Sequence, residues 1–271
     1  VSSSPTEQEA FERGARKNKP LAGPNLNVDI TALDGTALEL GTSSQVGQPA
    51  TWSRDTYEMM RTLIMGTPGC EAQVRVSDLL ISMARRNGLG ETDVYSYGVL
   101  GLVYAIGRNE EPAQRLTALN VSRFDALKQA AIEQLEGPFT VFPSVRLPTL
   151  CVDGIRNLFE RFDGAGFPRG VGGETIPLSA RLVSLTDTYV DLSLNPANPY
   201  GRCLPPKEAF DVVRQLAPTL FDPGAITLLQ ATLIDEIAST RILATKRVLL
   251  IDSDRALTRE LINAFRARGF T

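Results

Sequence analysis

The chain has 271 residues, enough for one large domain or two ordinary ones, and its 28 Lys and Arg against 31 Asp and Glu give a net charge of -3. This balance lacks the basic excess of a nucleic-acid-binding surface, so we expect no nucleic-acid partner. The sequence contains no histidine. Nucleophile–histidine pairs, imidazole metal ligands and a histidine proton shuttle are therefore excluded, and any activity has to use carboxylates, lysine, hydroxyls or the backbone.

The cysteine count and the length of the apolar runs indicate in which cellular compartment the protein is expected. Cys70, Cys151 and Cys203 are far apart and odd in number, which favours buried or reduced thiols in a cytoplasmic protein. No apolar run approaches about 18 residues and the start lacks the features of a signal peptide, so we expect no membrane partner. Because the chain begins with Val and stops directly after a helical pattern, we expect a fragment of a longer protein.

In chain order, residues 1–69 are predicted to form an N-terminal tail with a short hairpin around Asp34-Gly35 and a helix that starts near Thr56 after Ser53. From residue 70 the apolar spacing becomes helical. The expected helices cover residues 71–86, a segment beginning at Thr92 or Ser96, 123–135 with Ser122 as its cap, 150–162, 178–192, 207–216 and 223–239. No strand pattern interrupts residues 70–238, which we predict to be one all-α domain.

The pattern changes again over residues 246–271. An apolar run at 247–251 is typical of a buried strand, Asp252-Ser-Asp254 follows it, and 256–268 is an amphipathic helix. A strand, an acidic turn and a helix form the first half of a βαβ unit. The predicted fold class is therefore mainly α, with a small hairpin and helix region before the helical domain and a βα fragment after it.

The most specific segment is Arg161-Phe-Asp-Gly-Ala-Gly-Phe-Pro-Arg-Gly, a loop rich in Gly and Pro between two apolar helices. Together with Ile176-Pro-Leu-Ser-Ala-Arg and Thr186-Asp-Thr-Tyr, it resembles the signature of the HD-GYP domain. That family is a helical phosphodiesterase that hydrolyses cyclic di-GMP in bacterial signalling. The resemblance covers roughly residues 70–238 and implies an HD-domain-like helical bundle.

The same resemblance bears on the metal site. Family members hold two or three metal ions with histidines and aspartates. By similarity, Tyr104 and Ala105 stand at the family's His-Asp dyad, Leu158 and Phe159 replace its paired histidines, and Asp187 alone is retained. A lone carboxylate does not hold a dinuclear centre. We therefore expect no metal, no cofactor and no catalytic residue, and hence a protein that is not an enzyme.

The retained loop then suggests signalling by protein contact. The resemblance implies a docking surface for a diguanylate-cyclase-type domain, although a purely structural role of the loop is compatible with it. A histidine kinase is the other signalling partner that we expect. The sequence leaves open whether the chain forms a homodimer. The expected docking residues are Asp163, Gly164, Gly166, Phe167, Pro168 and Arg169.

Two alternatives remain. In the first, the chain is a non-hydrolysing cyclic di-GMP sensor whose phosphate contacts come from Arg108, Arg161 and Arg202. In the second, which the sequence favours less, it is a cyclic di-GMP phosphodiesterase. The tail at 246–271 resembles the start of a response-regulator receiver domain with Asp252 and Asp254 as its acidic cluster, and the aspartate that receivers phosphorylate would lie beyond Thr271.

Overall fold

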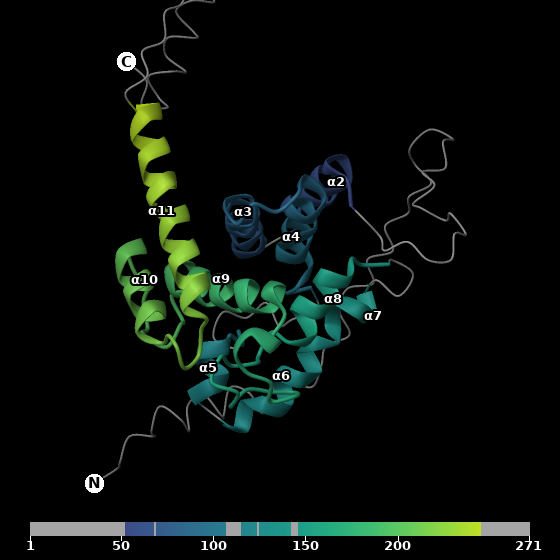
Figure 1. Ribbon diagram of the computed structural model, residues 1–271, viewed down its shortest axis with the longest axis vertical. Helices are drawn as coiled ribbons and strands as arrows, with labels where there is room; N and C mark the ends of the chain where they lie inside the picture. The colour runs from purple at the N-terminus through teal and green to yellow at the C-terminus, as the bar shows by residue number, and fades with distance from the viewer. Residues whose placement is uncertain (1–51, 68, 107–114, 124, 142–145, 245–271) are drawn as a thin grey trace, which may run out of the picture.

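The computed structural model describes residues 52–67, 69–106, 115–123, 125–141 and 146–244 (Figure 1). Every regular element in these ranges is a helix, so the predicted mainly helical, HD-like class is confirmed. The predicted hairpin and the segment 246–271 lie outside the described residues. The α-helices are α2 (Arg54–Met65), α3 (Glu71–Arg86), α4 (Glu91–Val103), α5 (Ala118–Arg123), α6 (Lys128–Leu135), α7 (Gly137–Val141), α8 (Thr149–Arg156), α9 (Leu178–Leu194), α10 (Pro206–Gln215) and α11 (Pro223–Ala244), with short 3-10 turns at Asp125–Leu127 and Gly173–Thr175.

Helix α9 is the centre of the bundle. It contacts α3, α8, α10 and α11 (Figure 1). Nearly all of its side chains from Ser179 to Leu192 are buried. A helix that is buried around its whole circumference needs partners on every side, which is how α9 is placed. Its side chains therefore reach the interior from a fixed scaffold, and two of them are the aspartates described below.

The crossing of α3 and α4 depends on a glycine. A Cβ added at Gly101 would lie 2.4 Å from Ser77 Cα and 2.5 Å from Ser77 N, so the two backbones approach too closely for any side chain at this position. The Ser77 hydroxyl donates a hydrogen bond of 2.8 Å to the carbonyl of Gly98, one turn earlier in α4. Through this contact, α3 and α4 pack closely against each other beside α9.

Helix α2 packs against the same core. It follows Ser53, as predicted. The Ser53 hydroxyl accepts a hydrogen bond from the Thr56 amide and caps the helix. Tyr57 is 3% exposed and lies 3.2 Å, hydroxyl to hydroxyl, from Ser77 of α3. Arg61 forms an ion pair with Asp78, which raises the Arg61 pKa. The domain boundaries at residues 69, 70 and 238 stay predictions.

Two predicted helices differ from the observed ones. Ser122 does not cap a helix at 123–135, because it lies inside α5 and its hydroxyl donates back to the carbonyl of Leu119. The helix predicted over 150–162 ends at Arg156, where the backbone of Asn157 leaves the helical region. Its end frees the chain to form the loop that follows.

Helix α11 is longer than the expected 223–239. Among its described side chains, which end at Ser239, the buried ones are Ala225, Ile226, Leu229 and Thr232. Despite this length, neither α11 nor any other helix in the described part of the chain combines the length and apolar character needed to span a membrane.

Candidate functional site: a glycine loop and a buried acidic cluster

The loop of residues 161–173, here called the glycine loop, is organised around one buried carboxylate. Glu160 is 3% exposed, and its two oxygens accept hydrogen bonds from the backbone amides of Arg169 (2.7 Å) and Val171 (3.2 Å). Buried backbone amides need such partners when no secondary structure supplies them. One side chain thus fixes the far end of the loop to its beginning.

Glycines let the loop fold back on itself. A Cβ at Gly166 would lie 2.2 Å from Arg161 N and 2.6 Å from Glu160 Cα, so only glycine fits there. Gly164 has a φ of 81°, in the left-handed region that glycine adopts without strain. The amide of Asp163 also donates to the carbonyl of Thr219, 2.9 Å away, which ties the loop to the turn before α11.

The predicted docking residues share one segment of this loop. Asp163, Pro168 and Arg169 are exposed, whereas the Phe167 ring stacks on buried Phe159 with 5.4 Å between ring centroids. Arg161 donates to both oxygens of Asp163, at 3.0 and 2.5 Å, and these hydrogen bonds lower the pKa of the Asp163 carboxyl. The loop therefore presents a polar edge on an aromatic base.

A second cluster, the Asp187 cluster, consists of Tyr104, Arg115, Asp187 and Asp191. The Tyr104 hydroxyl donates to Asp187 Oδ1 at 2.7 Å, and Arg115 Nη2 donates to the same oxygen at 2.9 Å. Arg115 Nε lies 3.4 Å from Asp191 Oδ1. Both carboxylates belong to α9, are one helical turn apart and are 1% exposed. Arg115 is not among the residues predicted from the sequence, because no motif marks it.

One guanidinium balances only one of the two carboxylates, and the pKa of Asp191 reflects this. Burial raises the pKa of Asp191 to about 6, against the opposing effects of Arg115 and of the Asn195 amide, which donates to Asp191 at 2.9 Å. The pKa of Arg115 is raised by the negative groups around it, which outweigh its own burial. The cluster thus holds a permanent cation and a carboxyl that takes up a proton near neutral pH.

This carboxyl makes stability depend on pH. The folded pKa of Asp191 lies near 6, above the ordinary value of 3.8, so the folded state binds more protons than the unfolded state between about pH 4 and 6. The Asp191 contribution to the free energy of unfolding therefore falls as pH rises through this range. We expect Asp191→Asn to be more stable than the wild type at pH 7.5 by an amount on the order of 2 kcal/mol, and the difference to shrink towards pH 4 in urea titrations. A difference that stays constant with pH would contradict this assignment.

The metal centre implied by the resemblance can be compared with these residues. Leu158 and Phe159 are 1% and 2% exposed and belong to the apolar core. The Asp187 carboxylate is already engaged by Tyr104 and Arg115. Among the described residues, no three His, Cys, Asp or Glu side chains come together in a group that could hold a metal ion. The residues around Asp187 therefore do not fit that centre.

Two of the arginines predicted to contact phosphate each form an ion pair with a different carboxylate. Arg161 pairs with Asp163 in the glycine loop, and Arg202 donates to Glu208 at 2.7 Å. Arg161 also borders a cavity of about 80 Å³, together with Lys128 and Phe159. That volume is far below the roughly 300–1,000 Å³ of small-molecule sites. Arg108, Asp252 and Asp254 lie outside the described residues, and their roles stay predictions.

Curated relatives match parts of the chain. The 3'3'-cGAMP-specific phosphodiesterase 1 of Vibrio cholerae is 26% identical over 143 residues, which is 52% of this chain and 32% of that protein. The cyclic di-GMP phosphodiesterase response regulator RpfG of Xanthomonas campestris is 39% identical over 70 residues, 26% of this chain and 18% of that protein. The chain thus spans a third or less of the length of these relatives.

A solved structure also resembles the fold. It is described as a cyclic GMP-AMP-specific phosphodiesterase of V. cholerae, and it aligns with a TM-score of 0.49 and 16% identity over 79% of this chain and 55% of that chain.

These relatives correct one prediction. The sequence predicts a protein that is not an enzyme, from the absence of the metal-binding histidines. The curated relatives that match this chain are named as phosphodiesterases, so the prediction is wrong.

The family itself follows from a longer match. A family model described as the HD domain matches residues 58–224, well over half of the chain. The match runs from α2 to the start of α11, so it includes both the glycine loop and the Asp187 cluster. This chain therefore belongs to the HD domain family.

Proposed function

We propose that this HD domain takes part in cyclic-dinucleotide signalling by binding a partner protein through its glycine loop. The observation that carries the proposal is the buried Glu160 carboxylate, which fixes the loop from inside while Asp163, Ala165 and Arg169 face solvent. The relatives named as cyclic di-GMP and cGAMP phosphodiesterases support the signalling context.

A preformed loop favours binding for a physical reason. Ordering a loop during association costs free energy, which reduces the affinity. Here the hydrogen bonds to Glu160, the close packing of Gly166 and the bond from Asp163 N to Thr219 O are already made. A partner therefore meets a shape that needs little further ordering.

The exposed chemistry suggests the character of the partner surface. Arg169 presents a guanidinium, and Ala165 and Pro168 of the same loop are exposed and have small apolar side chains. Such an edge suits a partner that supplies a carboxylate next to a flat apolar contact, because guanidinium–carboxylate pairs are strong and directional. We propose a diguanylate-cyclase-type domain as this partner, in line with the resemblance to HD-GYP domains.

The test is a calorimetric titration of the full chain with a purified diguanylate-cyclase domain. We expect binding at micromolar concentration, and at least a tenfold weaker affinity for Ala165→Glu combined with Arg169→Ala, about 1.4 kcal/mol. These side chains are exposed, so the variant keeps the hydrogen bonds to Glu160. Arg202→Ala, another exposed arginine, is the matched control and should bind as the wild type does. No heat with the wild type, or equal affinity of the loop variant, would contradict the proposal.

Hydrolysis of a cyclic dinucleotide is the second candidate function, because the named relatives are phosphodiesterases. The assay is incubation of the chain with cyclic di-GMP and with 3'3'-cGAMP, with and without added divalent cations, followed by chromatography for linear dinucleotides. Product that forms in proportion to the amount of protein would support this activity. Its absence with both substrates under all conditions would count against it.

A further inference from the structure

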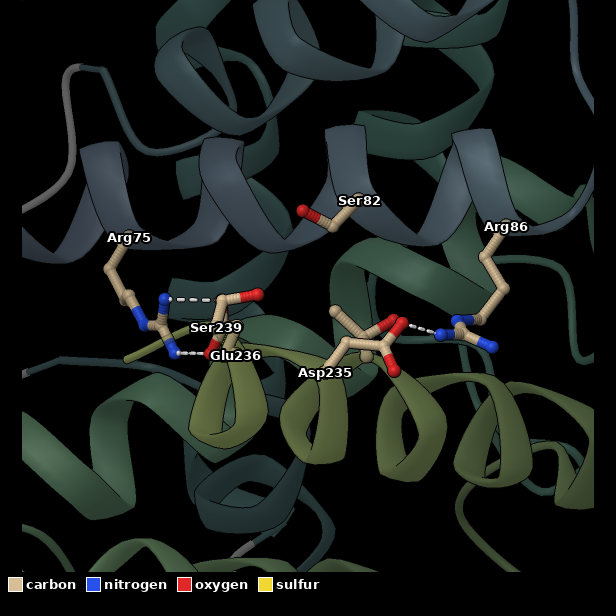
Figure 2. A pocket seen from close by; sticks show the side chains of 7 residues that line it. Arg75, Ser82, Arg86, Asp235, Glu236 and Ser239 are labelled. Atoms are coloured by element: carbon tan, nitrogen blue, oxygen red, sulfur yellow. Dashed lines mark hydrogen bonds and ion pairs between the residues drawn. The ribbon is translucent and has the colours of Figure 1, made fainter. Parts of the chain in front are cut away.

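A polar groove separates the second half of α11 from α3. It has a volume of about 470 Å³. Figure 2 shows side chains from the two helices reaching across it, with Ser82 of α3 between the two ends. The lining residues are Arg75, Ser82, Arg86, Thr232, Asp235, Glu236 and Ser239. All seven side chains carry polar or charged groups, so water that enters the groove finds hydrogen-bond partners there.

The apolar core supports only the first half of α11. Thr232 is the last buried residue among the side chains described for this helix. Beyond it, Leu233 packs partly against the core, whereas Ile234 and Ile237 are 57% and 53% exposed. The side chains described for the distal half of α11 (residues 233–244), which end at Ser239, therefore gain little from apolar burial when they lie against α3.

Two ion pairs bridge the groove instead. Arg75 donates to both oxygens of Glu236, at 2.8 and 2.6 Å, and Arg86 pairs with Asp235 (Figure 2). The side chains are between 33% and 64% exposed. Pairs this accessible contribute at most about 1 kcal/mol each and weaken as salt screens them.

We propose that the two pairs form an electrostatic latch that holds the distal half of α11 on α3 and releases it when they are screened or neutralised. Release costs little free energy, because it exposes polar and charged groups of the groove to water. Ile234 and Ile237 stay as exposed as before. Residues 245–271 follow directly after α11, so opening the latch changes where the chain leaves the bundle. Local opening of this kind is typical of segments with few buried apolar contacts.

Hydrogen exchange of the full chain, followed by mass spectrometry, tests the latch. A helical segment that leaves its support frays, so its amides exchange faster. We expect Asp235→Asn combined with Glu236→Gln to raise exchange across 233–244 about tenfold and to leave 223–232 unchanged. About 1 M NaCl should act on the wild type in the same direction.

Two further variants make the result specific. Exchanging the charges, with Arg75→Glu and Glu236→Arg in one chain, should restore most of the protection lost in Glu236→Arg alone. Asp211→Asn, which removes a carboxylate paired with Arg214 on α10, is the matched control and should leave α11 unchanged. Unaltered exchange at 233–244 in the double variant, or an equal rise along all of α11, would overturn the proposal.

Discussion

Replacing Arg115 by Met is expected to lower the free energy of unfolding by about 3–5 kcal/mol at pH 7.5. The substitution keeps an unbranched side chain of the size of the arginine stem but removes the cation that contacts both Asp187 and Asp191. The two carboxylates are 1% exposed, so water does not replace the lost partner. Urea denaturation measures the change. Arg202→Met, which removes an exposed pair with Glu208, is the control and should cost less than about 1 kcal/mol.

A double-variant cycle distinguishes lost charge compensation from lost packing. If the penalty comes from uncompensated carboxylates, Asp191→Asn should recover a large part of the stability in the Arg115→Met background. If only packing is lost, the two substitutions should be additive. An Arg115→Met protein as stable as the wild type would contradict the role of this guanidinium in the cluster.

The second large effect is expected at the crossing of α3 and α4. Gly101→Ala would place a methyl group 2.4 Å from Ser77 Cα, and this neighbour is backbone that has no rotamer to change. The two helices would have to separate, which opens the packing beside them. Overpacking of this kind typically costs 1–3 kcal/mol, and we expect a loss of about 3 kcal/mol in urea denaturation.

Gly90→Ser is the matched control for this substitution. A Cβ at Gly90 meets nothing within 4 Å, and Gly90 is the N-cap of α4, a position that favours serine. This variant should be at least as stable as the wild type. If Gly101→Ala were equally stable, the observed distance between α3 and α4 would be wrong.

Much of the fold could be predicted from the sequence because its signals are local. The apolar spacing in 71–86 and 178–192 predicts α3 and α9, and Pro206 marks the first turn of α10. Ser122 was misleading, because the same hydroxyl that can cap a helix can also bond back to a carbonyl within one. The helix predicted over 150–162 was too long, because the apolar residues after Arg156 pack as part of the loop base instead of continuing a helix.

The sites were predicted less completely, since they depend on contacts that are distant in sequence. The loop residues were identified from their resemblance to a family signature, but the role of Glu160 becomes visible only when its oxygens meet the amides of Arg169 and Val171. Arg115 lies 72 residues before Asp187 and carries no motif. The one available signal was physical: a buried aspartate on α9 requires a cation or several donors, and the sequence does not say which residue supplies them.

Hydrogen-exchange mapping of the chain with a diguanylate-cyclase domain tests the central claim most directly. With partner added to saturation, we predict slower exchange in the glycine loop, centred on Ala165, Phe167 and Arg169, and no change around Tyr104 or Arg115. The loop variant Ala165→Glu/Arg169→Ala should lose this protection at the same partner concentration. Protection that appears elsewhere while the glycine loop exchanges as in the free protein would contradict the claim that this loop binds the partner.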